Sequence, residues 1–225
     1  MDTLIFPGIF GAAVRAFFTR KEVGVDAEKI SRLLSVRKGS LYLPQQKHTD
    51  RVYLLDGDFS PVVADAVVTR QRGVLIGVQV ADCVPVLLHD TKHTVIGVVH
   101  AGWRGTAAQI VQKTIAVMVT QCGSLQENVV MALGPSIRGS CYEVGAEVKE
   151  AVYRATGEGE YYVRRGEKYF IDLASVNMLQ AMSAGIPAKN IWISGDCTHC
   201  NPEHYYSFRF SGECNGSQGG FIGIF

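Results

Sequence analysis

The sequence VIGVVHAGWRG (95–105) joins a run of apolar residues to a glycine-rich turn. The apolar residues 95–99 predict a buried strand that ends in His100. A helix is expected to follow from Thr106 to about Gln121, because apolar residues recur there at helical spacing, with Thr106 as N-cap and Gly123 just past the end. The stretch therefore predicts a strand, a tight turn and a helix, with a histidine where the strand ends.

Runs of Val and Ile surround this unit and predict further strands. Residues 65–69, 73–80, 84–89 and 95–100 are expected to form one sheet that is covered on both faces. Further strands are expected at residues 129–133, 191–194 and 205–210, with one or two more within 4–18. Helices are expected at residues 146–155 and from Asp172, as N-cap, toward Gly185, and residues 157–166 are predicted to be a solvated loop. This alternation indicates an α/β or mixed α+β fold with buried sheets.

Length and composition indicate one globular domain. The 225 residues are 47% hydrophobic and 19% charged, and they contain no repeat or linker-like tract, so a single domain over residues 1–225 is the simplest interpretation. The 22 basic and 21 acidic residues nearly balance, which argues against nucleic-acid binding. Pro7, Gly8 and Arg15 interrupt the apolar N-terminal segment, so neither a signal peptide nor a membrane span is expected. Six cysteines are too sparse for a disulfide scaffold and favour reduced thiols in a cytoplasmic protein.

Three residues with metal-binding side chains lie beside strand-like runs. His100 ends one run, Cys83 lies between two others, and His48 follows the polar stretch 45–47. Two imidazoles and one thiolate form a typical catalytic zinc set, because such sites take three protein ligands and leave a fourth position for water or substrate. The trio predicts a hydrolytic or group-transfer zinc enzyme. Asp82 is a carboxylate in an apolar region, so it is expected either to orient a ligand or to act as a general acid and base.

The turn after His100 has the features of an anion site. Gly102 and Gly105 let the backbone approach a ligand, Arg104 lies between them, and a helix is expected to begin close by. Phosphate is the natural ligand for such a turn. The spacing differs from that of a P-loop, and no Gly-Lys-Ser/Thr follows, so binding of a nucleoside triphosphate is not expected.

A Cys-x-x-Cys pair occurs at Cys197 and Cys200, with Thr198 and His199 between them. Such a pair can bind zinc, but the sequence holds no second matching pair. The pair is therefore interpreted as reduced thiols near the pocket.

Several motifs in the same order resemble the bacterial laccase-domain, or polyphenol oxidase, family. They are QKHTDRV (46–52), ADAVVT (64–69), ADCVP (81–85), HAGWRG (100–105), GPSI (134–137) and CYEVG (141–145). The family is known as zinc-dependent purine nucleoside phosphorylases with adenosine deaminase side activity. The resemblance implies His48, Cys83 and His100 as zinc ligands, a purine nucleoside and phosphate as substrates, and an α-β-β-α layered sandwich related to the catalytic domain of cytotoxic necrotizing toxins.

Two further matches lie near the chain ends and imply arginines that face the pocket. FTR (18–20) places Arg20 there, and YSFR (206–209) places Arg209. The chain also departs from the family pattern. Residues 21–24 replace a Gly-Gly turn, Phe210 replaces a second arginine, and Ser217-Gln218 stands where Gly-Arg is usual. These departures imply weaker or rearranged anion contacts from that end.

Three other functions remain open from the sequence. The toxin relationship implies a Cys83–His100 nucleophilic pair in a hydrolase or deamidase. The older family name implies a copper polyphenol oxidase, although several coppers would need more than the six histidines of this chain. The third is a metal-binding protein without catalytic activity. No protein partner is inferred.

Overall fold

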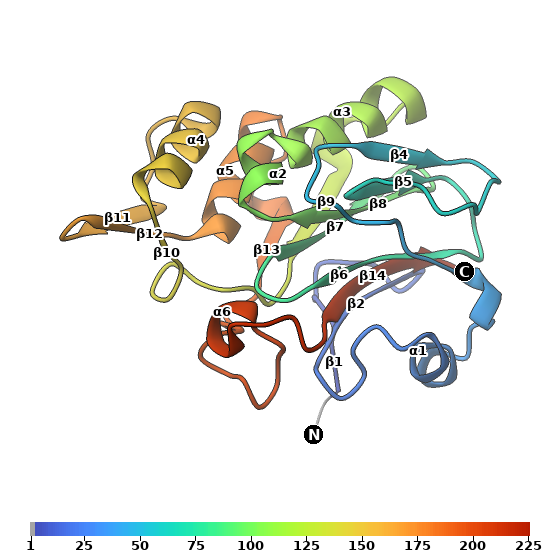
Figure 1. Cartoon of the computed structure of the whole chain (residues 1–225). Coiled ribbons are helices and arrows are strands. Elements are labelled where there is room, and N and C mark those ends of the chain that lie inside the picture. The colour runs from blue at the N-terminus through green and yellow to red at the C-terminus, as the bar shows by residue number, and fades with distance from the viewer. Residues whose placement is uncertain (1–2) are drawn as a thin grey trace.

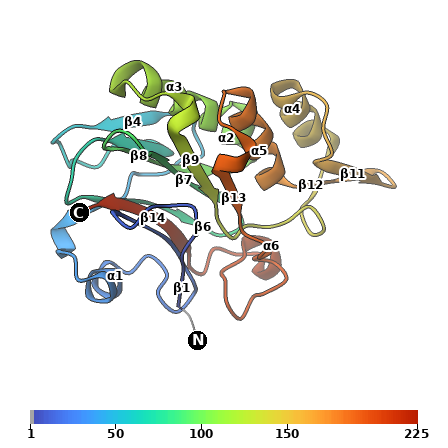
Figure 2. The ribbon, with the colours of Figure 1, turned by 180° about the vertical axis from the view of Figure 1, so that it is seen from behind.

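A computed structural model describes residues 3–225, and within them the chain forms four layers (Figure 1). Two large sheets stack face to face. Helices α2 (Trp103–Ala107), α3 (Ile110–Cys122), α4 (Ala146–Thr156) and α5 (Leu173–Ser183) cover one outer face, and α1 (Ala27–Leu34) covers the other. The reverse view shows the same order of layers (Figure 2). The predicted mixed α+β, α-β-β-α arrangement is confirmed.

The sheet that faces α2 to α5 has the strand order β13-β9-β7-β8-β5-β4. Its strands are β13 (Ile191–Ile193), β9 (Val129–Leu133), β7 (Val84–Asp90), β8 (Val95–Ala101), β5 (Ala66–Thr69) and β4 (Val52–Leu55). Strands β7 and β8 pair antiparallel, and their register places Pro85 opposite His100. Every residue of β8 is buried, as expected for a strand with packed layers on both faces.

The second large sheet has the order β1-β2-β14-β6-β3. It contains β1 (Leu4–Ile5), β2 (Val14–Thr19), β14 (Gln218–Ile224), β6 (Leu75–Val80) and β3 (Leu41–Tyr42). A smaller sheet, β10-β12-β11, is formed by Glu143–Val144, Lys168–Ile171 and Tyr162–Arg165. The remaining elements are the short helix α6 (Phe208–Ser211) and 3-10 turns at Lys38–Ser40, Gln126–Asn128 and Ala188–Asn190.

Three apolar clusters hold the layers together. The first packs α3, α4 and α5 on the β8 sheet and includes Val99 and Met118. The second lies between the two sheets and includes Phe18, and the third packs Ile30 of α1 under Phe221. Burying a side chain of this size contributes about 1.5–3 kcal/mol. Apolar contacts therefore hold the two sheets against each other and the helices against their outer faces. Within the described residues, no helix has both the length and the apolar character needed to cross a bilayer.

Five sequence predictions about the elements are wrong. β6 does not join the sheet of β5, β7 and β8 but pairs with β14, which lies near the end of the chain. The helix predicted from Thr106 to Gln121 is two helices, because Gln109 adopts φ 60° between them. Thr106 is buried inside α2, whose N-cap is Gly102, whereas Gly123 does cap α3.

The other two errors concern polar segments. Residues 157–166 are not all loop, because Tyr162–Arg165 forms β11 and pairs with β12 in a hairpin. Residues 205–210 are not a strand, since the Ser207 hydroxyl caps α6 by accepting a bond from the Phe210 backbone N–H. The predicted helix 146–155, the Asp172 cap of α5 and the strands at 129–133 and 191–194 are confirmed.

Candidate metal centre

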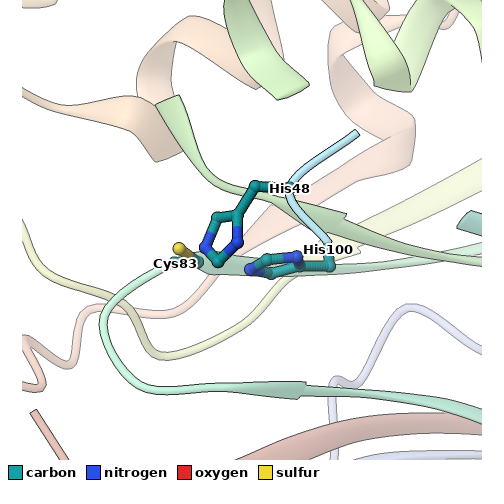
Figure 3. A group of neighbouring side chains, drawn as sticks. All are labelled: His48, Cys83 and His100. Carbon is teal, nitrogen blue, oxygen red and sulfur yellow. The ribbon is translucent and has the colours of Figure 1, made fainter. Parts of the chain in front are cut away.

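The three predicted ligands come together where the two large sheets meet (Figure 3). Cys83 lies in the turn that leads from β6 in one sheet to β7 in the other, and His100 is the sixth residue of β8. The candidate ligand atoms of His48, Cys83 and His100 all lie within 4.8 Å of one another. The two imidazole rings meet edge to face, with centroids 4.8 Å apart.

A buried carboxylate, Asp65, supports both histidines. It lies directly before β5 and is 0% exposed. One oxygen is 2.8 Å from Nδ1 of His100. The same carboxylate accepts hydrogen bonds from the backbone N–H groups of Lys47, His48 and Thr49 and from the Thr49 hydroxyl. Asp65 therefore fixes the orientation of His100 and the path of the loop that carries His48.

This loop needs such support because its backbone is strained. His48 adopts φ 56°, in the left-handed region that few residues other than glycine adopt. The bonds to Asp65 offset that cost. Sequence reasoning missed the role of Asp65, although a buried carboxylate beside an apolar strand is the same signal that drew attention to Asp82.

The charges in the group favour a thiolate at neutral pH. Burial alone would raise the pKa of the Cys83 thiol, but the imidazoles of His100 and His48 lower it to about 6. Burial would lower the pKa of His100, but the Cys83 thiolate and the bond to Asp65 raise it to about 9. Burial also acts against the ionised Asp65, yet its hydrogen bonds hold its pKa well below the usual value. A divalent cation would replace the proton that Cys83 and His100 share.

The donor set fits such a cation. Since Asp65 occupies Nδ1 of His100, Nε2 is the nitrogen left to bind a metal, which is the carboxylate–histidine–metal arrangement common in proteins. His48 is exposed, Cys83 is half-buried and His100 is only 4% exposed, so one side of the group is open to solvent. Three ligands with an open side are typical of a catalytic zinc site.

Gly102 is required by the closeness of the group. A Cβ atom on this residue would lie 3.0 Å from Sγ of Cys83 and 3.3 Å from Cδ2 of His48. Gly105 is packed elsewhere, against Ile110 and the Thr49 carbonyl. The first glycine of the predicted anion turn therefore makes room for the ligands, and the second makes room for the loop of His48.

Asp82, the neighbour of Cys83, holds the C-terminal segment. It is 7% exposed and adopts φ 88°. Its Oδ1 accepts a 2.6 Å bond from the Thr198 hydroxyl, and its Oδ2 accepts a 2.7 Å bond from the Arg209 backbone N–H. Both oxygens are thus engaged away from the three ligands.

The charges of Arg104 and Arg209 both act on Tyr142, for which sequence reasoning had assigned no role. The Arg104 guanidinium lies 4.3 Å from the Trp103 ring centroid, and that of Arg209 lies 5.0 Å from the Tyr142 centroid. Burial and the charges of Cys83 and Asp82 raise the pKa of Tyr142 to about 12, against the opposing effect of both arginines. A protonated hydroxyl and two cations therefore border the candidate metal centre.

Arg20 is not part of this arrangement. It lines a separate cavity with Thr3, Trp192 and Asp196, and none of the three ligands is among the described residues that line it. The Nε of Arg20 is buried and has no hydrogen-bond partner among residues 3–225, while the guanidinium interacts with the Tyr205 hydroxyl.

Two of the C-terminal departures from the family pattern, Phe210 and Gln218, make neutral contacts in the structure. Gln218 is buried. Its side-chain oxygen accepts a hydrogen bond from the backbone N–H of Tyr206, and its side-chain nitrogen donates one to the Tyr206 carbonyl. Phe210 is exposed and contacts the His199 ring edge to face, with centroids 5.8 Å apart. Neither position supplies a cation.

The fold and the site define a layered α+β protein with a candidate metal centre of two histidines and one cysteine. The chain belongs to the multi-copper polyphenol oxidoreductase laccase family, whose family model matches residues 19–225. The resemblance in the sequence motifs is thereby confirmed.

Relatives with assigned activities share much of the chain. It is 37% identical over 205 residues to adenosine deaminase RL5 from an unknown prokaryotic organism, covering 85% of this chain and 77% of that protein. It is 35% identical over 207 residues to a purine nucleoside phosphorylase of Bacteroides thetaiotaomicron, covering 83% and 76%. The crystal structure of YlmD from Geobacillus stearothermophilus matches with a TM-score of 0.91 at 25% identity, over 97% of this chain and 94% of that one. These names support an enzyme of this family.

Proposed function

We propose that this protein is a zinc-dependent purine nucleoside phosphorylase that cleaves adenosine and inosine with phosphate, has adenosine deaminase side activity and also accepts methylthioadenosine. The observation that carries the proposal is the convergence of His48, Cys83 and His100 within 4.8 Å, with an open side. The names of the relatives, which include both activities, support the substrate class. A cytoplasmic location, where thiols stay reduced and purine nucleosides and phosphate are available, belongs to the same proposal.

Phosphorolysis requires that phosphate be held near the anomeric carbon and that the departing purine be stabilised. Arg104 and Arg209 would bind the phosphate, helped by the backbone at Gly102 and Gly105. Arg20 would contribute from its neighbouring cavity only in a substrate complex that reaches it. The Tyr142 hydroxyl, with a pKa of about 12, stays protonated at neutral pH and would donate a hydrogen bond to the phosphate or the purine.

The ligands and their supports have separate parts in this proposal. His48, Cys83 and His100 would hold the zinc, which supplies a Lewis acid at the open position, as the deaminase reaction requires. Asp65 would keep His100 oriented. Of the two roles considered for Asp82, the bonds to Thr198 and Arg209 favour the orienting one, because both carboxylate oxygens already accept hydrogen bonds.

The test is a chromatographic product assay with adenosine or inosine, with and without phosphate. Wild type is expected to release free base only with phosphate and to convert some adenosine to inosine. Cys83→Ala is expected to lose both activities by more than about a hundredfold, because two imidazoles hold zinc poorly. Cys214→Ser, which changes an exposed thiol elsewhere, should match wild type. Wild-type protein that yields neither product, or stoichiometric copper in protein purified without added metal, would contradict the proposal.

A second candidate function rests on one observation. The Cys83 thiol is hydrogen-bonded to the His100 imidazole, which is in turn hydrogen-bonded to the Asp65 carboxylate. A thiol hydrolase or deamidase uses a triad of this kind. Chelation separates the two functions. Activity that survives metal removal but is lost on alkylation of Cys83 would favour the nucleophile, whereas activity lost on chelation and restored by zinc favours the phosphorylase.

A further inference from the structure

A second group of metal-binding side chains lies outside the site described above. The ligand atoms of Cys141, His199 and Cys200 all lie within 4.8 Å of one another. The Sγ atoms of Cys141 and Cys200 are 3.2 Å apart. The Cys197 thiol interacts with both of these thiols, so three sulfurs and one imidazole gather in one place.

Two loops of the same edge bring these residues together. Cys141 lies between β9 and β10, and residues 197–200 lie between β13 and α6. The loops are fixed to each other by a parallel bridge between Ser136 and Cys197 and by a 3.1 Å bond from the Thr198 N–H to the Ser136 carbonyl. The Arg138 N–H also donates to Sγ of Cys197 at 3.4 Å. The juxtaposition of the four side chains is therefore built into the backbone.

The exposure of the four residues suits an ion that enters from solvent. Cys197 is buried, Cys141 and His199 are half-buried, and Cys200 is exposed. The Phe210 ring lies against His199 and covers part of the group. Three thiols in contact cannot all ionise unless a cation compensates their charge.

We propose that Cys141, Cys197, His199 and Cys200 bind a second zinc ion, in a closed structural site. Three sulfurs and one nitrogen are a standard structural zinc set. A tetrahedral ion with Zn–S bonds of about 2.3 Å separates its sulfurs by about 3.8 Å, so the thiols need to move apart only slightly. A disulfide between Cys141 and Cys200 would use two sulfurs and leave Cys197 and His199 without a role.

This second site would also position the first. Thr198 lies between two of the proposed ligands. Its hydroxyl donates a hydrogen bond to the carboxylate of Asp82, the residue before Cys83. The same carboxylate accepts a hydrogen bond from the backbone N–H of Arg209. An ion bound to the loop 197–200 would hold this chain of contacts in place, and through it the turn of Cys83 and the Arg209 side chain beside Tyr142.

Zinc content of purified protein tests the proposal independently of activity. The full chain is purified with reductant and without added metal, and zinc per chain is measured by mass spectrometry. Wild type is expected to hold about two equivalents, and Cys83→Ala about one, because the second set of four ligands remains complete. The double variant Cys83→Ala/Cys200→Ser is expected to hold less than about half an equivalent. Cys214→Ser, the matched control for an exposed thiol, should equal wild type.

Cobalt substitution identifies the ligands. Cobalt-loaded Cys83→Ala is expected to show strong thiolate-to-metal absorption, which Cys200→Ser in that background removes or weakens. If Cys83→Ala does not fold, His48→Ala serves instead, because His48 is exposed. Absence of zinc from a folded first-site variant, equal zinc with and without Cys200, or a Cys141–Cys200 disulfide in protein kept from oxidants would each overturn the proposal. None of these outcomes depends on whether the first site cleaves nucleosides.

Discussion

The two cysteine–histidine groups of this molecule differ in how they are built. His48, Cys83 and His100 sit at strand ends and on a turn between sheets, and the buried Asp65 holds both histidines. The second group, Cys141, Cys197, His199 and Cys200, sits on two loops that bond to each other through backbone groups. The first offers three donors and an open side next to Arg104, Arg209 and Tyr142. The second offers four donors and a phenyl ring against one of them.

The number of donors and the groups around them separate a reactive metal site from a structural one. Four soft donors close the coordination of zinc, whereas three leave a position for substrate. A buried carboxylate behind a histidine raises its basicity and fixes its orientation, which a reacting centre needs.

Among substitutions outside the three candidate ligands, Asp65→Asn should have the largest effect. An amide cannot accept all the bonds that the carboxylate accepts, so we expect zinc affinity at the first group to fall by about 10- to 100-fold. The free energy of unfolding should fall by about 3 kcal/mol. Competition with a chelating dye and urea unfolding measure the two effects. Asp56→Asn, which changes an exposed carboxylate away from the group, is the control, and an equal loss of zinc affinity in both variants would contradict the special role of Asp65.

Gly102→Ala should weaken only the first group. Its methyl group would press on Cys83 and His48, so zinc affinity there should fall by about tenfold while the fold is retained. Gly11→Ala, where a Cβ meets nothing within 4 Å, is the control. Zinc titration monitored by a competing chelator checks the result. Wild-type affinity in Gly102→Ala would show that the ligands are less tightly placed than the structure indicates.

Arg209→Ala should raise the KM for phosphate by about tenfold with a smaller change in kcat. The substitution leaves the Asp82 contact intact, because the backbone N–H of Arg209 makes it. Steady-state kinetics at varied phosphate measures the effect. Arg154→Ala, on the exposed face of α4, should behave as wild type. An unchanged phosphate KM in Arg209→Ala would place the anion subsite elsewhere.

Cys83 should be alkylated a few-fold faster than Cys122 at neutral pH, and the labelling rates of the two thiols should depend differently on pH. In metal-free protein the Cys83 pKa of about 6 keeps the reactive thiolate present at neutral pH, and labelling should decline only as the pH falls through 6. Burial raises the pKa of Cys122, so its labelling should still be rising above pH 9. Iodoacetamide footprinting by mass spectrometry compares the two thiols. Parallel pH profiles would contradict the thiolate at Cys83, and added zinc should protect Cys83.

The apolar and polar patterns predicted the mixed α+β class and selected His48, Cys83 and His100, which the structure brings together, whereas the four-layer order was implied by the family resemblance. Strong apolar runs such as 95–99 specify buried strands locally, and soft donors at their ends are visible without a structure. The sheet to which β6 belongs was not predictable, because its partner β14 lies near the other end of the chain. The strand expected at 205–210 failed because the Ser207 cap favours a helical turn over pairing.

The remaining site features depend on long-range contacts. Tyr142 lies against the guanidinium of Arg209, which is far away in the chain, and Cys141 contacts Cys200 across 59 residues. The Cys-x-x-Cys motif alone therefore could not show that Cys141 joins Cys197 and Cys200 in the second group. A structural role for Asp65 could have been predicted from the sequence, because a carboxylate beside a buried apolar strand needs hydrogen-bond partners.

A crystal structure with anomalous diffraction data on both sides of the zinc absorption edge would test directly whether His48, Cys83 and His100 bind one zinc ion. We expect an anomalous peak bonded to Sγ of Cys83, Nε2 of His100 and a ring nitrogen of His48, with the Asp65 carboxylate still hydrogen-bonded to Nδ1 of His100. Crystals grown with zinc that show no such peak, and a Cys83 sulfur bonded only to the His100 imidazole, would contradict it.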